Sequence, residues 1–313
     1  MKHLQTLKLI DAVNKAGSIR KAAEDMHITS SALNRRILGF EEEFGAPIFE
    51  RLHGGVRLNP AGELLIEHIR GQMADLERVR SQVADLSGLR RGHVSIACSQ
   101  ALQPYFMPAQ IAAYRAEHPG VSFSVQVRDR EAAEEGLRAF QSDLALVFEP
   151  VHLGDFDVLL SVEQPVFAVM AKDHPLIEKR DLRLRDCLGF PHVVPPKRIG
   201  IRFLLDLAVS RMSQKLEPIA EADSFEFMRH YVQQEQAVGF QFPIGLNLAG
   251  DDRLEFRPLP KSDVTYGNLT LMQMKGRTLS VASARFANQL AATLNDLAGA
   301  PDPLPRQLDL KRS

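Results

Sequence analysis

The first sixty residues repeat apolar positions at three- and four-residue steps, the spacing of helices that pack on one face. One such stripe predicts a helix over residues 2–15, and it consists of Leu4, Leu7, Ile10 and Val13. The stretch GSIRKAAEDMHITSSALNRR, residues 17–36, predicts two further short helices joined by a tight turn. The beginning of the chain is therefore expected to be a small helical domain.

Both helices of the 17–36 stretch have a cap residue. Ser18 and Thr29 each precede a run of helix formers, so their hydroxyls can accept a bond from a free backbone N–H. The second helix would bury Ala32, Leu33, Ile37 and Phe40 and would expose short polar and basic groups, which suit base edges and phosphates. The pattern favours a helix-turn-helix, although an amphipathic helical hairpin with solvated arginines fits the periodicity as well.

Two features follow the helices. Residues 48–52 and 56–58 flank Gly54-Gly55 and predict a two-stranded wing, whose basic residues either contact DNA phosphates or are ordinary surface charge. Asn59-Pro60 then begins a helix that runs to Leu86, about 40 Å at about 1.5 Å per residue. Its heptad spacing predicts a dimer seam, unless the helix packs on the C-terminal domain of the same chain. The seam residues are Leu65, Ile69, Leu76, Val79, Val83 and Leu86.

The chain changes character beyond a short hinge at 87–92. Apolar runs alternate with helical segments, which predicts parallel strands with right-handed crossovers and hence an α/β domain. The expected strands are 94–98, 121–127, 144–148, 165–170, 193–194, 238–241 and 269–274. The expected helices are 104–117, 131–140, 201–215, 225–234 and 279–297.

Three runs carry a family resemblance. AGSIRKAAEDMHITSSALNR at 16–35, EEEFGAPIFER at 41–51 and LNPAG at 58–62 resemble the winged helix-turn-helix of the LysR-type transcriptional regulators. The chain departs from the family at Ser30, where glutamine is frequent, and at Asn34, where serine is frequent. Both lie on the expected reading face, so the operator sequence of a relative cannot be transferred. The expected DNA-binding residues are Ser18, Arg20, Lys21, Thr29, Ser30, Ser31, Asn34, Arg35, Arg36, Arg51, His53 and Arg57.

The second half resembles the regulatory domain of the same family, through SDLAL at 142–146, HPL at 174–176 and GFQFP at 239–243. The resemblance implies a two-lobed fold like that of periplasmic binding proteins. The expected domains are a winged helix-turn-helix at 1–58, a linker helix and hinge at 59–91, a regulatory domain at 92–300 and a mobile tail at 301–313. Lobe I would comprise 92–162 and 266–300, and lobe II would comprise 163–265.

A ligand site is expected where strands end and helices begin, because free N–H groups converge there. The cationic run at 197–202 favours an anion, so we expect a small carboxylate metabolite, unless the run is a solvated loop. For the aromatic members of the set, Phe148 and Phe242, packing in the core is the favoured role. The expected residues are Ser99, Gln100, Ala101, Arg128, Phe148, Glu149, Arg198, Gly200, Ile201, Arg202 and Phe242.

The charge, cysteine content and hydropathy of the chain limit the functions that it can have. A net charge of −1 means that any DNA binding must be local, and residues 15–36 do hold more basic than acidic side chains. Cys98 and Cys187 are isolated, which suits reduced thiols rather than a disulfide or a metal site, and no cofactor motif is present. No run approaches the roughly 18 apolar residues of a membrane helix, so a place in the cytoplasm with the nucleoid is expected.

The sequence thus predicts a dimeric or tetrameric transcription regulator, and not an enzyme. It would bind double-stranded operator DNA and change its contacts when a small molecule enters the C-terminal cleft. One alternative keeps DNA binding without an effector. The other is an α/β binding protein or enzyme with a helical appendage.

Overall fold

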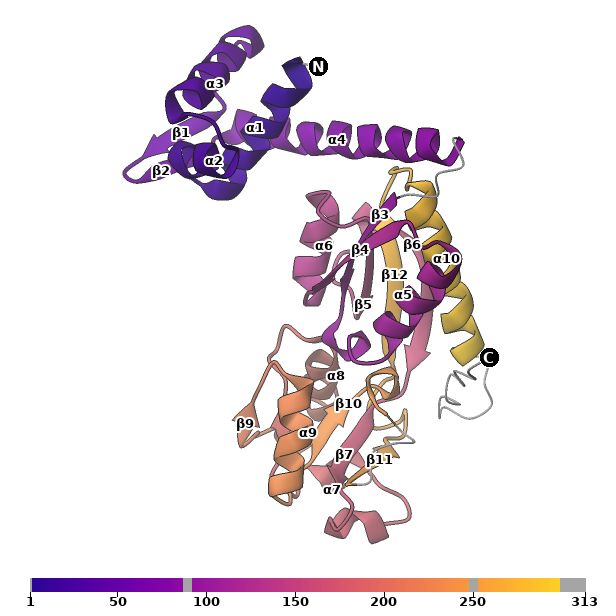
Figure 1. The fold of residues 1–313 in the computed structure, drawn as a ribbon. Coiled ribbons are helices and arrows are strands. Elements are labelled where there is room, and N and C mark those ends of the chain that lie inside the picture. The colour runs from indigo at the N-terminus through magenta and orange to yellow at the C-terminus, as the bar shows by residue number, and fades with distance from the viewer. Residues whose placement is uncertain (1, 87–91, 248–252, 299–313) are drawn as a thin grey trace. The chain divides into compact units, whose positions relative to one another are not determined.

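The computed structural model describes residues 2–86, 92–247 and 253–298. The chain forms two compact units that divide at Arg80, within a long helix. The first unit holds α1 (Lys2–Ala16), α2 (Ile19–Asp25), α3 (Ser30–Phe44), β1 (Phe49–Leu52), β2 (Gly55–Leu58) and most of α4 (Pro60–Leu86) (Figure 1).

The helix boundaries of the first unit follow its caps, as predicted. The hydroxyl oxygen of Ser18 accepts a bond from the N–H of Lys21 at 3.4 Å, and that of Thr29 accepts one from Ala32 at 3.2 Å. Gly45 ends α3 with φ 83°, in the left-handed region that favours glycine. Strands β1 and β2 pair antiparallel and form the predicted wing.

The core of the first unit uses part of α4. Leu65 and Ile69 are 8% and 0% exposed and pack with Ile10, Leu33 and Ile37. This corrects the predicted dimer seam, because the apolar surface of these two side chains is used within the chain. Of the remaining seam residues, Leu76 is half-buried and Val79 and Val83 are exposed, while the side chain of Leu86 lies outside the described set.

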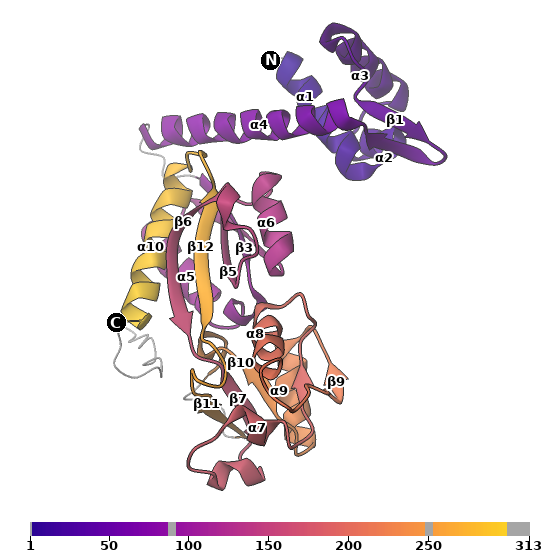
Figure 2. The same ribbon diagram turned by 180° about the vertical axis from the view of Figure 1, so that it is seen from behind.

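The second unit begins with a five-stranded sheet, which we call lobe I. Its strand order is β4-β3-β5-β12-β6. Alternate residues of β3 and β5 face opposite sides, so α6 covers one face while α5 and α10 cover the other (Figures 1 and 2). The elements are β3 (Gly92–Cys98), α5 (Phe106–Glu117), β4 (Val121–Val127), α6 (Arg130–Arg138), β5 (Leu144–Phe148), β6 (Phe156–Gln164), β12 (Gly267–Met274) and α10 (Val281–Ala298).

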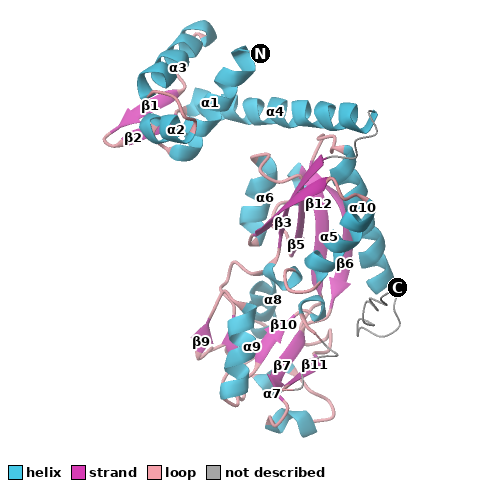
Figure 3. Ribbon diagram, viewed as in Figure 1, coloured by secondary structure: helices cyan, strands magenta, loops and turns pink. Residues whose placement is uncertain are grey.

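Lobe II comprises the elements between β6 and β12. Three strands in the order β10-β7-β11 pair antiparallel, and a short pair, β8 and β9, is parallel (Figure 3). The elements are β7 (Phe167–Ala171), α7 (Leu184–Cys187), β8 (Val193–Val194), α8 (Gly200–Val209), β9 (Ala220–Glu221), α9 (Phe225–Gln234), β10 (Gly239–Gln241) and β11 (Leu254–Pro258). The described residues of both lobes also form 3₁₀ turns, namely η1 (Gln100–Leu102), η2 (Leu153–Asp155), η3 (Pro175–Glu178) and η4 (Pro243–Gly245).

The expectation of parallel sheets is only partly right. Strands β4, β3 and β5 are parallel, but β12 runs antiparallel to both of its neighbours because the chain returns there from lobe II. Strands β6, β9 and β11 were not predicted. The helix expected over 201–215 ends at Val209. Of the predicted hinge at 87–92, Gly92 is the first residue of β3, whereas the rest of the hinge and the predicted tail lie outside the described residues.

His174 gives a pH dependence that can be measured. It is 1% exposed, its Nδ1 accepts the N–H of Leu176 at 3.2 Å, and its burial lowers its pKa below the ordinary 6.5. The unfolded chain therefore binds a proton at a pH where the native chain does not. Stability from this group is complete above about pH 6.5 and declines below it, by at most about 1.4 kcal/mol per pH unit.

The measurement is urea unfolding at neutral pH and at about pH 5.5, compared between the wild type and His174→Asn, whose amide oxygen can also accept the Leu176 bond. The variant should lose less stability than the wild type on acidification. Equal losses in both proteins would contradict the assignment.

Both cysteines are fully buried, and burial raises the pKa of each thiol to about 12. Thiols with such a pKa are poor nucleophiles at neutral pH. Among the helices in the described ranges, none combines the length and hydropathy that crossing a membrane requires. Within those ranges no three metal-ligating side chains gather into a possible ion site.

Candidate nucleic-acid interface and ligand cavity

The first two turns of α3 carry the residues expected to read DNA. Ser31, Arg35 and Arg36 are exposed, and Ser30 and Asn34 are half-buried. The hydroxyl oxygens of Thr29 and Ser31 lie 3.2 Å apart, so one donates to the other. In the described part of the chain, the guanidinium groups of Arg35 and Arg36 form no ion pair or hydrogen bond. Both can therefore reach a base edge or a phosphate without breaking a contact.

The residues predicted on α2 differ in availability. The oxygen of Ser18 is used by its cap, and Arg20 lies 3.3 Å from Glu24, although both side chains are largely exposed. Lys21 is exposed and its amine has no partner among the residues that the structure describes. An exposed ion pair such as Arg20–Glu24 contributes little free energy, so it does not prevent a phosphate contact.

The wing contacts α3 through a side-chain hydrogen bond. Nη2 of Arg51 donates to Oδ1 of Asn34 at 3.3 Å, which leaves the amide nitrogen of Asn34 free to act as a donor. Arg57 lies 2.9 Å from Glu50 on the paired strand, so its charge is partly compensated. His53 is exposed at the tip of the wing. The structure thus places Arg51 beside α3, whereas Arg57 pairs within the wing itself.

A cavity of about 340 Å³ lies between lobes I and II. It contains most of the residues predicted to bind an effector, namely Ser99, Gln100, Ala101, Arg128, Phe148, Arg198, Gly200, Ile201 and Phe242. Lobe I supplies the residues that follow β3 and β4 together with the end of β5. Lobe II supplies the starts of α8 and α9 and the residue after β10. Most of the cavity lining was therefore predicted by expecting a ligand site where strands end and helices begin.

Two predicted residues do not line the cavity. Arg202 is buried, and its guanidinium donates to Asp206, to Glu221 and to the carbonyl oxygen of Pro195. It is a structural residue of lobe II, because all three of these partners belong to that lobe. The carboxylate of Glu149 accepts the N–H of Asn268 at 2.7 Å instead.

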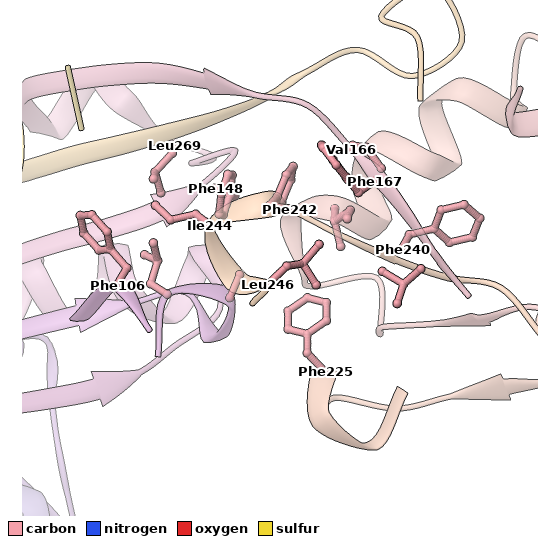
Figure 4. Packing of buried hydrophobic residues seen from close by; sticks show 14 of the residues in the cluster. Phe106, Phe148, Val166, Phe167, Phe225, Phe240, Phe242, Ile244, Leu246 and Leu269 are labelled. Atoms are coloured by element: carbon pink, nitrogen blue, oxygen red, sulfur yellow. The ribbon is translucent and has the colours of Figure 1, made fainter. Parts of the chain in front are cut away.

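Several contacts across the cavity join the lobes. The rings of Phe148 and Phe242 stack with their centroids 3.7 Å apart (Figure 4). The side-chain oxygen of Gln100 accepts the N–H of Phe225 at 3.2 Å, and Nε of Arg198 lies 3.5 Å from Oδ2 of Asp129. Both stacked rings are buried, as core packing predicts, and both also line the cavity.

Helix ends supply N–H groups to this cavity. Helix α8 begins at Gly200 without a side-chain cap. The starts of α6 and α9 are capped by Asp129 and Ser224. Gly200 also approaches lobe I so closely that an added Cβ would lie 2.8 Å from the carbonyl oxygen of Phe148. A small anion can bind at the free end of α8.

Sequence reasoning missed seven lining residues. They are Val127, Asp129, Arg130, Ala132, Ile199, Asp223 and Phe225. The capping motif that begins at Asp129 marks the start of α6, directly after β4, and the same rule of helix starts would have included it. Asp223 and Phe225 flank the cap residue Ser224, which signals the start of α9 in the same way.

Known families match both units. The family described as "Bacterial regulatory helix-turn-helix protein, lysR family" matches residues 4–63, and the "LysR substrate binding domain" matches residues 87–295. The transcriptional activator CmpR of Synechocystis is 23% identical over 92% of this chain and 95% of its own length. The transcriptional activator LysR of Escherichia coli is 28% identical over 71% of each chain.

Solved structures share the fold. Full-length OxyR from Pseudomonas aeruginosa matches with a TM-score of 0.70 at 19% identity, covering 93% of this chain and 94% of the other. CbnR complexed with its target DNA matches with a TM-score of 0.55 at 15% identity, covering 93% and 99%. The relatives are named as regulators rather than enzymes. With both of its units matched, this chain belongs to the LysR family of DNA-binding transcriptional regulators, which carry a C-terminal effector-binding domain.

Proposed function

We propose that this regulator reads its operator with α3 and the wing, and that a small carboxylate metabolite in the cavity between the lobes changes those contacts. The observation that supports the effector is the cavity itself. Three guanidinium groups line it beside the uncapped start of α8. Guanidinium groups and free backbone N–H groups both favour a carboxylate.

Exposed basic side chains support the proposed DNA binding. Lys21, Arg35 and Arg36 lie on α2 and α3, and each is exposed. Phosphate contacts would set the register of the protein, while Asn34 and Arg35 would contact base edges. Each phosphate contact lowers the affinity as salt rises, so operator binding should weaken steeply with ionic strength.

We further propose that the protein acts in the cytoplasm as a dimer or a dimer of dimers. The exposed Val79 and Val83 on α4 support a helix pairing. Two copies would present two reading helices to half-sites about one helical turn apart. Sedimentation of the purified protein, alone and with operator DNA, tests the assembly.

A thermal-shift panel of organic acids tests whether a carboxylate binds to the protein. An acid present at a hundred times its dissociation constant should increase the free energy of unfolding by about 2.7 kcal/mol. Arg128→Gln should reduce that gain, because it removes a cation from the cavity lining and leaves the fold intact. Gel shifts with DNA from upstream of the gene should still show binding by this variant.

The control for the panel is Arg285→Gln, which removes a charge from an exposed position of α10, away from the cavity. It should leave the thermal shift unchanged. If no acid stabilises the wild type, a regulator that binds DNA without an effector becomes the better description.

A further inference from the structure

Two carboxylates line the cavity, and neither belongs to the set of residues expected from the sequence. Its lining holds Arg128, Arg130 and Arg198 against Asp129 and Asp223, which leaves one net positive charge. A cavity whose sole electrostatic property was positive charge would not be lined by carboxylates. The positions of these two aspartates therefore affect which anions the cavity can bind.

Arg198 is already compensated within the protein. Its Nε lies 3.5 Å from Oδ2 of Asp129, and its Nη2 lies 3.2 Å from Oδ2 of Asp223. Asp129 belongs to lobe I, whereas Arg198 and Asp223 belong to lobe II. The two carboxylates occupy positions around the guanidinium that a ligand carboxylate would otherwise take.

The other two arginines have no acidic partner in the described part of the chain. Nη2 of Arg128 donates to the neutral amide of Gln126 at 3.0 Å. Nη1 of Arg130 donates to the carbonyl oxygen of Glu149 at 3.1 Å, and the guanidinium lies 4.5 Å from the ring centre of Phe203. Nε of Arg130 is buried without an acceptor among the described residues. A buried donor of this kind favours a bound acceptor.

We propose that Asp129 and Asp223 make the cavity selective for monocarboxylates. A single carboxylate is held by Arg128 and Arg130, and a second carboxylate on the same ligand is repelled by the aspartates beside Arg198. The inference rests on the proposed function of the cavity as a carboxylate site, and it narrows the effector to one chemical class.

The rest of the lining suits the apolar part of such a ligand. Val127 is 37% exposed and Ala132 is half-buried, so both contribute apolar surface to the lining, and a volume of about 340 Å³ is small for a ligand pocket. The effector class is therefore a compact monocarboxylate with an aromatic or aliphatic body.

The test uses substitutions that remove charge and keep shape. Asp223→Asn alters a side chain that is 72% exposed, so the fold does not depend on its charge. Asp129→Asn keeps the cap of α6, because an amide oxygen can also accept the N–H of Ala132. The matched control is Glu135→Gln, which is also 72% exposed and is not among the residues that line the cavity.

Calorimetry on the full chain compares two pairs of probes that differ by one carboxylate, benzoate with phthalate and butanoate with succinate. At neutral pH and low salt, the wild type should bind each monocarboxylate at least about tenfold more tightly than its partner. Asp223→Asn should reduce that ratio about threefold, and the double variant with Asp129→Asn should reduce it about tenfold. Glu135→Gln should leave it unchanged.

The possible results distinguish a failure of this inference from a failure of the proposed carboxylate site. If carboxylates bind but the ratio is the same in all four proteins, or if the wild type prefers the dicarboxylates, charge selection by the aspartates is wrong while the carboxylate site stands. If none of the probes binds the wild type or any variant, the carboxylate assignment fails, and the inference fails with it. Asp223→Asn alone decides the matter if the double variant does not fold.

Discussion

Replacing Asn34 or Arg35 by alanine should abolish the preference for operator over unrelated DNA. Both side chains lie on the first turns of α3, and Arg35 is exposed with no partner in the part of the chain that the structure describes. A bidentate contact with a base contributes about 1–3 kcal/mol of discrimination, and a dimer loses it at both half-sites. A substitution at an exposed site such as Arg35 changes stability by about 0.5 kcal/mol or less, and Asn34→Ala removes in addition one hydrogen bond from Arg51, so the fold should persist in both variants.

Gel shifts with the operator and a scrambled duplex, at one fixed salt concentration, measure this effect. Arg285→Ala removes the same charge from the second unit and should leave both affinities unchanged. Circular dichroism checks that each variant remains folded. Specific binding that survives in both Asn34→Ala and Arg35→Ala would place the reading face elsewhere.

The second large effect concerns two glycines in helices. A Cβ added at Gly62 would lie 2.1 Å from the carbonyl oxygen of Ile48, and the N–H of Gly62 is held by Asn59 at 2.8 Å. Gly62→Ala must therefore push the wing and α4 apart, at a cost of about 1–3 kcal/mol. Gly39 is exposed on α3, and a Cβ there meets nothing within 4 Å. Gly39→Ala should instead stabilise the helix by about 0.5–1 kcal/mol.

Hydrogen exchange on peptides from residues 2–58 of the full chain detects both effects in one experiment. Exchange should accelerate in Gly62→Ala and slow in Gly39→Ala. The same substitution is made in both proteins, so a common effect of alanine on the unfolded chain does not explain opposite signs. Equal exchange in the two variants would show that the wing tolerates displacement.

Local signals in the sequence were sufficient for the first unit. Ser18, Thr29 and Gly45 define helix ends by bonds within a few residues, and these bonds are present in the fold. The dimer seam was partly wrong because a heptad pattern does not say which partner buries it. In this chain the seam's first two residues, Leu65 and Ile69, are buried by the chain's own core.

The second unit depends on contacts between residues far apart, and prediction was weaker there. Strand β6 has an irregular burial pattern at the edge of its sheet, so no clean alternation marks it. Strand β12 is antiparallel to its neighbours because the chain re-enters lobe I there from lobe II, and no local sequence pattern encodes that return. Most of the cavity was found because strand ends and helix starts are local features. Arg202 was misplaced because its partners, Asp206 and Glu221, are set by the packing of lobe II.

The position of β12 between β5 and β6 also orders the folding of the chain during synthesis. Strand β5 can pair with β3 early, but its other neighbour in the sheet, β12, is missing until residues 267–274 leave the ribosome, more than a hundred residues after β5 is made. The first unit closes its core within residues 2–73. At translation rates of about 5–20 residues per second, the stretch from residue 74 to residue 274 takes about 10–40 s to synthesise, so α3 can be folded that long before lobe I is complete.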